Sequence, residues 1–256
     1  MHVYISTDFL PDEFSGRRAL VTGGSRGIGA AIAQRLLDGG AQVVTSARSA
    51  TDDTPKDSTF IAGDLRSESG ARQVVDQAVS ALGGLDIVVN AAGAARAYVG
   101  GPAAIPDHEW QDSIDINFLS AVRVISASLP ALQESGGGAA IINISTGSAN
   151  NPQPPVLHYG AAKAALAAYS KGLAKALAPA GIRVNVVTPG PVETPGGTEI
   201  LQTIADAMGV PLAGLARNIP LGRFGDPRDI AEVVTFLASA RGQWVTGAEF
   251  DVNGGQ

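Results

Sequence analysis

Short runs of apolar residues alternate along the chain with longer stretches in which apolar residues recur every three or four positions. The short runs are typical of strands buried on both faces, and the longer stretches have the spacing of helices with one buried side. The expected strands are residues 18–22, 42–46, 59–65, 85–90, 139–145, 183–188 and 248–252. The expected helices begin near residues 30, 67, 107, 159 and 227. This alternation predicts an α/β fold, a doubly wound parallel sheet of about seven strands with helices on both faces.

No linker, repeat or change of composition divides the chain, so we expect a single domain over residues 1–256. Residues 1–15 carry no clear pattern and are interpreted as an N-terminal arm. Residues 191–221 form a long connection with a helical middle, interpreted as a substrate-loop insertion. The apolar residues between Glu199 and Leu215 suit a mobile lid over a substrate, and an oligomer contact is the equal alternative.

Composition narrows the class of protein. Hydrophobic residues make up 45% of the chain and charged residues 16%, which indicates a globular protein. A net charge of -6 argues against nucleic-acid or anionic-membrane partners. The chain has no cysteine, and its three histidines follow no metal-ligand spacing, so we expect no metal site. With no signal-peptide pattern and no uncharged apolar run of membrane-spanning length, we expect a cytoplasmic protein.

A glycine-rich loop joins the first expected strand to the first helix. Gly23 allows a sharp turn, while Gly27 and Gly29 let the backbone approach a pyrophosphate and let the helix pack on the sheet. The N-terminus of the helix then faces the anion with free N–H groups. The alternative is a tight turn without a ligand. In the strand–loop–helix context, the pattern favours a dinucleotide site in a Rossmann-like domain.

The end of the second strand bears on the choice of dinucleotide. An acidic side chain near this point binds the ribose hydroxyls in many dinucleotide folds. This chain has Ala47 and Arg48 there, and Arg26 in the first loop adds a second cation. Because guanidinium groups pair well with a phosphate, our hypothesis is NADP(H), with NAD(H) as the alternative. Arg48 can also be read as a solvated charge at a strand end.

Tyr159 and Lys163 lie in an alanine-rich segment that predicts a helix, so they share a face one turn apart. A lysine ammonium beside a phenol favours the phenolate. We therefore expect Lys163 to lower the pKa of Tyr159 from about 10 and to make it a usable proton donor near neutrality. On its own the pair favours an ordinary alanine-rich helix with a core aromatic residue and a solvated lysine, and the other motifs of the chain are what favour a catalytic pair.

Other polar residues stand at points where a parallel sheet places its ligands. Thr146 and Ser148 follow the fifth strand, and Asp64 ends the third, where it can accept from an adenine amino group or cap a turn. Asn117 lies among apolar neighbours in a helix. A buried asparagine needs partners, so it is either a structural hydrogen-bond hub or part of a water relay.

Taken together, these motifs resemble the classical short-chain dehydrogenase/reductase family. The likeness runs from about residue 18 to residue 255 and rests on the order of the motifs Thr22-Gly23-x-x-x-Gly27-x-Gly29, Asp64, Asn90-Ala91-Ala92-Gly93, Asn117, Ser145-Thr146, Tyr159-x-x-x-Lys163 and Pro189-Gly190. The resemblance implies an NAD(P)-dependent oxidoreductase that acts on a carbonyl compound or a secondary alcohol and is usually a tetramer.

The resemblance also implies roles for single residues. Tyr159 would be the general acid and base, Lys163 would lower its pKa and hold the nicotinamide ribose, and Asn117 would support a water chain that returns the proton. Thr194 would contact the nicotinamide amide, and Asn90 and Asp64 would line the adenosine side. The implied cofactor-binding residues are Gly23, Ser25, Arg26, Gly27, Ile28, Gly29, Arg48, Asp64, Leu65, Asn90, Ala91, Gly93, Tyr159, Lys163, Pro189, Gly190, Val192 and Thr194.

Two positions depart from the family pattern. Ala91 replaces the second asparagine of the Asn-Asn-Ala-Gly turn, a common variant. The substrate-orienting serine is expected thirteen residues before the tyrosine, and Thr146 occupies that place. A threonine hydroxyl can donate the same hydrogen bond, although its methyl group restricts the rotamer. We expect Thr146, Ser148 and Tyr159 to contact substrate, with Thr146 in the serine role and Ser148 as the second choice.

The expected activity is hydride transfer between NADP(H) and a free small or mid-sized carbonyl or alcohol. Many relatives reduce 3-oxoacyl groups on an acidic carrier protein, which needs basic docking residues. The helix ends at residues 133–136 and 178–181 carry no cation, which argues against that substrate. The remaining alternatives are an NAD-dependent alcohol dehydrogenase and a non-catalytic dinucleotide-binding regulator. The intact Tyr159/Lys163 pair argues against the regulator.

Overall fold

The protein is described by a computed structural model that covers residues 12–256, and most of the expected N-terminal arm lies outside the described residues. Within this range one sheet has seven parallel strands in the order β3-β2-β1-β4-β5-β6-β7. The strands are β1 (Arg18–Thr22), β2 (Gln42–Ala47), β3 (Thr59–Ala62), β4 (Ile87–Asn90), β5 (Ala140–Ile144), β6 (Arg183–Pro189) and β7 (Glu249–Val252). The predicted fold class is therefore confirmed.

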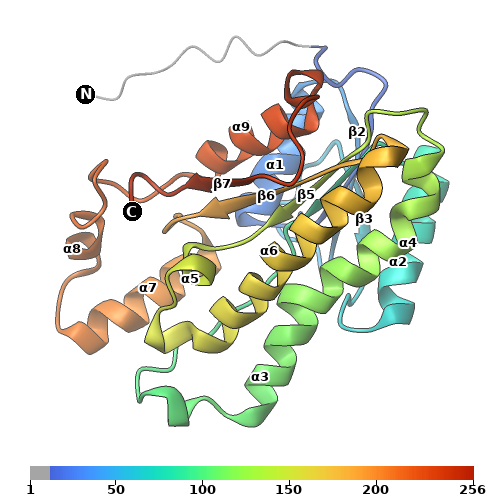
Figure 1. Cartoon of the computed structure of the whole chain (residues 1–256). Helices are drawn as coiled ribbons and strands as arrows, with labels where there is room; N and C mark the ends of the chain where they lie inside the picture. The colour runs from blue at the N-terminus through green and yellow to red at the C-terminus, as the bar shows by residue number, and fades with distance from the viewer. Residues whose placement is uncertain (1–11) are drawn as a thin grey trace.

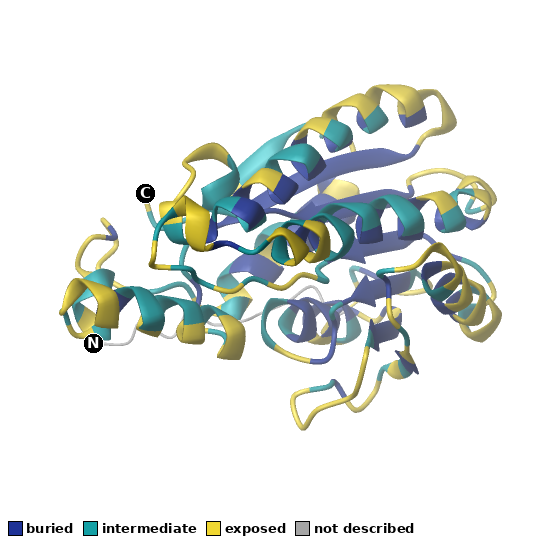
Figure 2. Cartoon of the chain, turned by 90° about the horizontal axis from the view of Figure 1, so that it is seen from below, coloured by how far each residue is buried: buried dark blue, intermediate teal, exposed yellow. Residues whose placement is uncertain are grey.

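Helices cover both faces of the sheet (Figure 1). On one face lie α1 (Gly27–Asp38) and α9 (Pro227–Ala238), and on the other lie α2 (Glu68–Leu82), α4 (Ser120–Gln133) and α6 (Leu157–Leu177). The sheet between them is buried, and the helices are buried along the sides that face it (Figure 2). The shorter helices are α3 (Asp107–Ile114), α5 (Gly147–Asn150), α7 (Pro195–Met208) and α8 (Leu212–Ala216).

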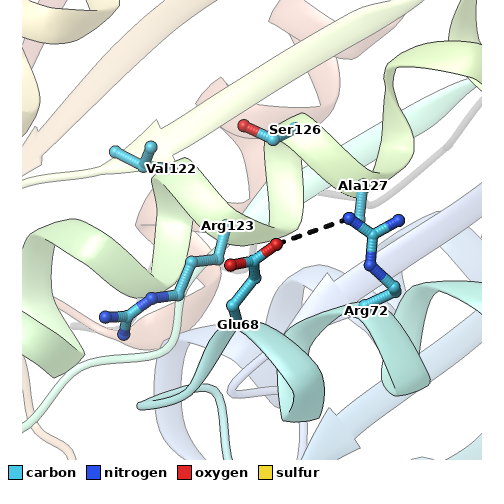
Figure 3. Close-up of a pocket in the computed structure, with 6 residues that line it drawn as sticks. All are labelled: Glu68, Arg72, Val122, Arg123, Ser126 and Ala127. Atoms are coloured by element: carbon cyan, nitrogen blue, oxygen red, sulfur yellow. Dashed lines mark ion pairs between the residues drawn. The ribbon is translucent and has the colours of Figure 1, made fainter.

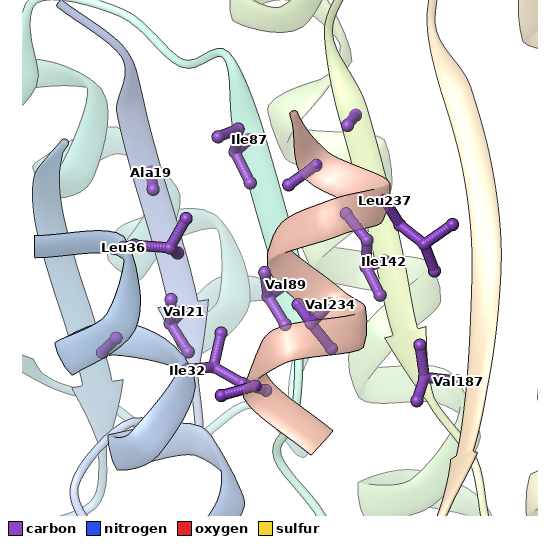
Figure 4. Packing of buried hydrophobic residues seen from close by; sticks show 14 of the residues in the cluster. Ala19, Val21, Ile32, Leu36, Ile87, Val89, Ile142, Val187, Val234 and Leu237 are labelled. Atoms are coloured by element: carbon purple, nitrogen blue, oxygen red, sulfur yellow. The ribbon is translucent and has the colours of Figure 1, made fainter. Parts of the chain in front are cut away.

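Two apolar cores hold the layers together. In the first, Ile32 and Leu36 of α1 and Val234 of α9 pack on the β-branched side chains of β1, β4 and β5 (Figure 4). The second core joins α2, α4 and α6 to the opposite face of the sheet. Each fully buried leucine or isoleucine contributes about 1.5–3 kcal/mol relative to exposure. The layers thereby fix the carboxyl ends of the strands in relation to one another.

Several element boundaries differ from the sequence prediction. β3 ends at Ala62 instead of residue 65, because the chain turns away from β2 after Gly63 donates its N–H to the Ala47 carbonyl at 3.0 Å. α1 begins inside the glycine loop, at Gly27. The long helix that starts at Asp107 is interrupted by a π-turn, η2 (Asp115–Leu119). α9 begins at Pro227 as expected, and Asp226 caps it by accepting a hydrogen bond from the Arg228 N–H at 2.8 Å.

The helical run Asp107–Gln133 passes a length and composition test for a membrane span, with a mean hydropathy of 1.2 over its most apolar window. It is the single run among the described residues that does so, and core helices of soluble proteins pass the same test. Its buried side chains pack on α2 and on the sheet, and it contains the ion pair between Arg123 and Asp115. We therefore assign the run to the helical layer of this fold.

Candidate functional site

The polar residues singled out in the sequence gather at the carboxyl ends of the central strands. β1 leads into the glycine loop and β4 into the Ala91–Gly93 turn, and these two strands are neighbours at the point where the strand order reverses. β5 leads to Thr146, and β6 ends at Pro189. Ligands of open parallel sheets bind at such a switch point, so the topology brings the predicted residues to one edge.

The glycine loop has the geometry of a pyrophosphate cradle. Gly23 has a φ of +68°, and a Cβ there would lie 2.7 Å from the Ala91 carbonyl oxygen. A Cβ on Gly29 would lie 2.2 Å from the Gly23 oxygen, and one on Gly27 would lie 3.1 Å from the Thr194 Cγ2. Ile28 follows in the first turn of α1, which has no acidic residue and no side-chain cap. Its N–H groups can therefore bind an anion.

A basic corner flanks this loop. Arg26 and Arg48 are exposed, and neither guanidinium has a hydrogen-bond or ion-pair partner within residues 12–256. The segment after β2 folds back onto the loop, because the Thr51 and Thr54 hydroxyls donate to the Ser25 carbonyl at 2.5 and 3.2 Å. Two cations thus border the cradle at the end of β2, where the chain has Ala47 and no carboxylate.

The turn after β3 presents Asp64 to solvent. Its Oδ1 accepts the Arg66 N–H at 3.0 Å, and its side chain is 55% exposed. The neighbouring Leu65 side chain is buried in the second core, so Leu65 offers only its backbone to a ligand. The expected adenine contact can therefore come from the Asp64 carboxylate and the adjacent main chain.

Asn90 is placed differently from the other predicted cofactor residues. Its side chain is buried, and Nδ2 donates to Asn143 Oδ1 at 2.8 Å, while Asn143 Nδ2 donates to the Ser170 hydroxyl at 2.8 Å. This line of hydrogen bonds joins β4, β5 and α6. The Asn90 side chain thus links the sheet to the helix, and only its backbone is left to line a nucleotide.

The predicted catalytic side chains meet at the end of β5. The Thr146 side chain lies near the Tyr159 phenol and lowers its pKa. Lys163 is 3% exposed, and its Nζ donates to the Ile144 carbonyl at 2.7 Å. Ser148 donates its backbone N–H to Thr146 Oγ1 at 3.4 Å and packs against Gly160, the residue after the tyrosine. Both hydroxyl residues therefore lie near the tyrosine, and Thr146 is the one that shifts the pKa of the phenol.

The expected lowering of the Tyr159 pKa is not seen. Burial raises the pKa of the Tyr159 phenol, and the Thr146 side chain opposes this only in part. Burial also lowers the pKa of Lys163 to about 8. Burial disfavours the charged form of both groups, and Lys163 is not among the groups that shift the Tyr159 pKa, so the attraction between an ammonium and a phenolate on which the sequence argument relied does not set this pKa.

Asn117 is a hydrogen-bond hub in the π-turn η2. It is 1% exposed, its Oδ1 accepts the Ala94 N–H at 3.0 Å, and its Nδ2 donates to the Ala94 carbonyl at 2.8 Å. Nδ2 also lies 3.2 Å from the Ser113 hydroxyl. A Cβ on Gly93 would lie 3.0 Å from Asn117 Oδ1 and 3.6 Å from Lys163 Nζ. The amide therefore fixes the loop after β4 beside the lysine.

The segment after β6 completes the edge. Gly190 packs on the backbone of Asn253, where a Cβ would lie 2.8 Å from the Asn253 Cα. Val192 is buried and forms a bridge with Gly225. Thr194 caps α7 by accepting the Gly197 N–H at 3.0 Å, and its methyl group faces the glycine loop. The predicted nicotinamide-side residues thus stand opposite the predicted pyrophosphate site.

Sequence reasoning missed His158, the residue before the candidate acid. It is 1% exposed, and neither ring nitrogen has a hydrogen-bond partner among the described residues. The rings of Tyr98 and Trp110 lie edge-on to it, with centroids at 5.7 and 6.2 Å. Burial lowers its pKa, and the nearby Glu109 carboxylate opposes this. The sequence signal was a polar residue at the start of an apolar helix.

Two hollows lie away from these residues. One of about 180 Å³ is a groove between α2 and α4, lined by Glu68, Arg72 and Arg123 among others (Figure 3). The other, of about 440 Å³, lies beside α8 and the turn at Gly222. Within residues 12–256 no group of three or more His, Asp or Glu residues is arranged to hold a metal ion. The candidate site therefore rests on side-chain geometry rather than on these hollows.

Comparison with known proteins adds evidence of a different kind. A protein-family model described as enoyl-(acyl carrier protein) reductase matches residues 23–256. L-fucose dehydrogenase of Mus musculus is 36% identical over 94% of this chain and 89% of its own length. The 3-oxoacyl-[acyl-carrier-protein] reductase FabG of Salmonella typhimurium is 34% identical over 94% of this chain and 98% of its own.

Solved structures show the same architecture. The ligand-free aldohexose dehydrogenase of Thermoplasma acidophilum has a TM-score of 0.86 and 26% identity, covering 95% of both chains. A short chain dehydrogenase from Burkholderia cenocepacia, solved in complex with NADP, has a TM-score of 0.84 and 30% identity, covering 95% of this chain and 98% of its own.

Proposed function

Because the chain belongs to the classical short-chain dehydrogenase/reductase family and is an NAD(P)-dependent oxidoreductase, we propose that it transfers a hydride between NADP(H) and a small or mid-sized carbonyl compound or secondary alcohol. The observation that carries the proposal is the gathering of Thr146, Tyr159 and the buried Lys163 at the end of β5, where Lys163 Nζ donates to the Ile144 carbonyl at 2.7 Å. A bound nicotinamide supplies or accepts the hydride, and the protein binds, orients and moves the proton.

The hydroxyl groups of Thr146 and Tyr159 have different roles toward the substrate oxygen. In the direction of reduction, Thr146 and Tyr159 donate hydrogen bonds to the carbonyl oxygen, and Tyr159 gives up its phenolic proton as negative charge develops there. Lys163, with a pKa of about 8, is mostly an ammonium at pH 7. Its charge therefore favours the proton transfer and stabilises the transition state more than the ground state.

The preference for NADP(H) is supported by the basic corner. Arg26 and Arg48 are exposed and unpaired within the described residues, and β2 ends in Ala47 instead of an acidic residue. Asp52 and Asp53 follow in the segment that folds back onto the glycine loop. We expect kcat/KM for NADPH to exceed that for NADH at least about tenfold, which corresponds to 1.4 kcal/mol. Equal values, or a preference for NADH, would contradict this part of the proposal.

The substrate is best identified by a screen of ketones, aldehydes and secondary alcohols, followed through the absorbance of the reduced nicotinamide. L-fucose and D-aldohexoses belong in the screen because two relatives are named for such sugars. A 3-oxoacyl thioester should be tested free and attached to acyl carrier protein. The segments after α4 and α6, residues 134–136 and 178–181, lead into the amino ends of β5 and β6 and so lie at the edge of the sheet opposite the candidate site. Their lack of cations does not bear on carrier docking, and the rates with the free and the carrier-bound thioester decide between the two substrates.

We also propose a cytoplasmic homotetramer, as the family resemblance implies. Large apolar side chains on the described surface support self-association: Trp244 is 98% exposed and Leu221 is 72% exposed. The apolar side chains on the accessible side of α7 either close over the substrate or pack on another subunit. Light scattering coupled to size exclusion gives the mass in solution, and a monomer would contradict the proposal.

A further inference from the structure

Arg123 of α4 reaches across the α2–α4 groove to the end of β3. Its Nη1 donates to the Arg66 carbonyl at 2.5 Å and lies 3.5 Å from the Leu65 carbonyl. Its Nη2 donates to Asp115 Oδ1 at 2.8 Å. The guanidinium is turned away from the Glu68–Arg72 pair in the same groove (Figure 3). With its side chain 21% exposed, Arg123 is held by one carboxylate and by two backbone acceptors.

These acceptors belong to the turn that carries Asp64. The carbonyls of Leu65 and Arg66 lie between the end of β3 and the start of α2, so neither the pairing of strands nor the helix supplies their hydrogen bonds. Asp64 Oδ1 accepts the Arg66 N–H at 3.0 Å, which ties the carboxylate to the residue whose carbonyl Arg123 holds. Asp64 Oδ1 also lies 3.6 Å from Arg66 Nη1, and Oδ2 accepts no hydrogen bond among the described residues. The orientation of this carboxylate thus depends on the turn.

The other partner of Arg123 belongs to a different part of the candidate site. Asp115 is the first residue of the π-turn η2, which also carries Asn117. Asn117 in turn holds the peptide of Ala94, after β4. The Arg123 guanidinium thus joins two parts of the candidate site. It binds the Asp64–Arg66 turn at the adenosine end, and it binds the helical turn whose Asn117 holds the loop at the catalytic end.

We propose that Arg123 is a positioning residue for the adenine end of the dinucleotide site. It holds the Asp64–Arg66 turn so that Asp64 accepts from the adenine amino group while Leu65 stays anchored in the core. This inference rests on the proposed dinucleotide site but adds a residue outside it. If Arg123 had a purely structural role, its replacement would lower stability and would weaken the binding of both halves of the cofactor equally. That difference can be measured.

The test compares Arg123→Met with Arg72→Met. Both variants remove a guanidinium from the same groove, but the Arg72 side chain is 63% exposed and, among residues 12–256, pairs only with Glu68 at 3.5 Å. Binding of NADPH, of ADP-ribose 2′-phosphate and of nicotinamide mononucleotide is measured by calorimetry. For Arg123→Met we expect roughly tenfold weaker binding of the first two ligands, since a lost charge-assisted hydrogen bond has that order of effect. Nicotinamide mononucleotide should bind equally to all variants, and Arg72→Met should match the wild type.

Two further variants keep the test decisive. Arg123→Lys retains the charge beside Asp115 but cannot bridge two acceptors, so we expect intermediate binding if Arg123→Met does not fold. In an Asp64→Asn background, Arg123→Met should cause less than a twofold further loss, because the group that it positions is already altered. Unchanged binding of ADP-ribose 2′-phosphate by a folded Arg123→Met, or an equal loss for both halves, would overturn the inference. Wild-type protein that binds no dinucleotide would instead contradict the proposed function itself.

Discussion

At the scale of single residues, the candidate site combines a hydroxyl pair with a buried lysine. That Thr146 lies near Tyr159 was expected from the family resemblance, which places a substrate-orienting hydroxyl thirteen residues before the tyrosine. The direction of the Tyr159 pKa shift could not be foreseen. Spacing says that an ammonium is near, but burial, which decides the sign here, is a property of the folded site.

Thr146 provides the most direct test of this pair. Replacing Thr146 by Val keeps the shape but removes the donor to the substrate oxygen, so we expect kcat to fall roughly 100- to 1,000-fold, as for the loss of other oxyanion donors. Thr146→Ser restores the hydroxyl and should keep most of the activity. Ser148→Ala is the matched control and should retain turnover. Steady-state kinetics of the three variants decide the assignment, and the reverse pattern would transfer the role to Ser148.

His158 gives a prediction about pH. Burial lowers its pKa below the ordinary value of about 6.5 and Glu109 opposes this, so the folded protein binds its proton less readily than the unfolded chain. As pH falls below about 6.5, the unfolded state takes up more protons and stability decreases. His158→Phe removes this titration and fits the aromatic surroundings. We therefore expect a smaller drop in Tm between pH 7 and pH 5 for the variant than for the wild type.

The control for this measurement is His108→Phe, because the His108 side chain is 72% exposed. It should show the same dependence of Tm on pH as the wild type. If His158→Phe also keeps the wild-type slope, the buried imidazole is not the group that titrates in this range.

At the scale of elements, strands were predictable and irregular turns were not. A buried parallel strand is marked in the sequence by its continuous apolar run, so all seven strands were located to within a few residues. The π-turn at Asp115–Leu119 keeps nearly the same apolar spacing as an α-helix. Nor does sequence alone show that Asn117 holds the peptide of Ala94, since the two residues belong to different elements.

The contact between α5 and α6 can be tested with two glycines of one helix. A Cβ on Gly160 would lie 2.6 Å from the Ser148 carbonyl oxygen, whereas one on Gly172 would meet nothing within 4 Å. Gly160→Ala should therefore cost about 1–3 kcal/mol of unfolding free energy through overpacking. Gly172→Ala should add about 0.5–1 kcal/mol, because alanine favours the helix. Urea unfolding of both variants measures the difference, and equal effects would mean that the two helices do not pack closely at Gly160.

At the scale of the whole molecule, the net charge of the chain and the local charge beside the glycine loop have opposite effects on the binding of NADPH. The chain carries a net charge of -6, which disfavours the approach of a polyanion, yet in the described part of the chain Arg26 and Arg48 stand unpaired beside the glycine loop. Attraction between exposed charges is screened by salt, with a Debye length of about 8 Å at physiological ionic strength. NADPH, with its extra phosphate, should therefore lose more affinity than NADH as salt is added.

The last prediction follows from that contrast. For the wild type, KM for NADPH should rise with ionic strength more steeply than KM for NADH. Arg48→Ala should raise KM for NADPH about tenfold at low salt, the effect of losing a charge-assisted contact, and should flatten its salt dependence. KM for NADH should barely change, because its ribose presents hydroxyls where NADPH presents a phosphate. Equal salt slopes for the two cofactors in the wild type would show that the basic corner binds no phosphate, even if the enzyme proves active with both.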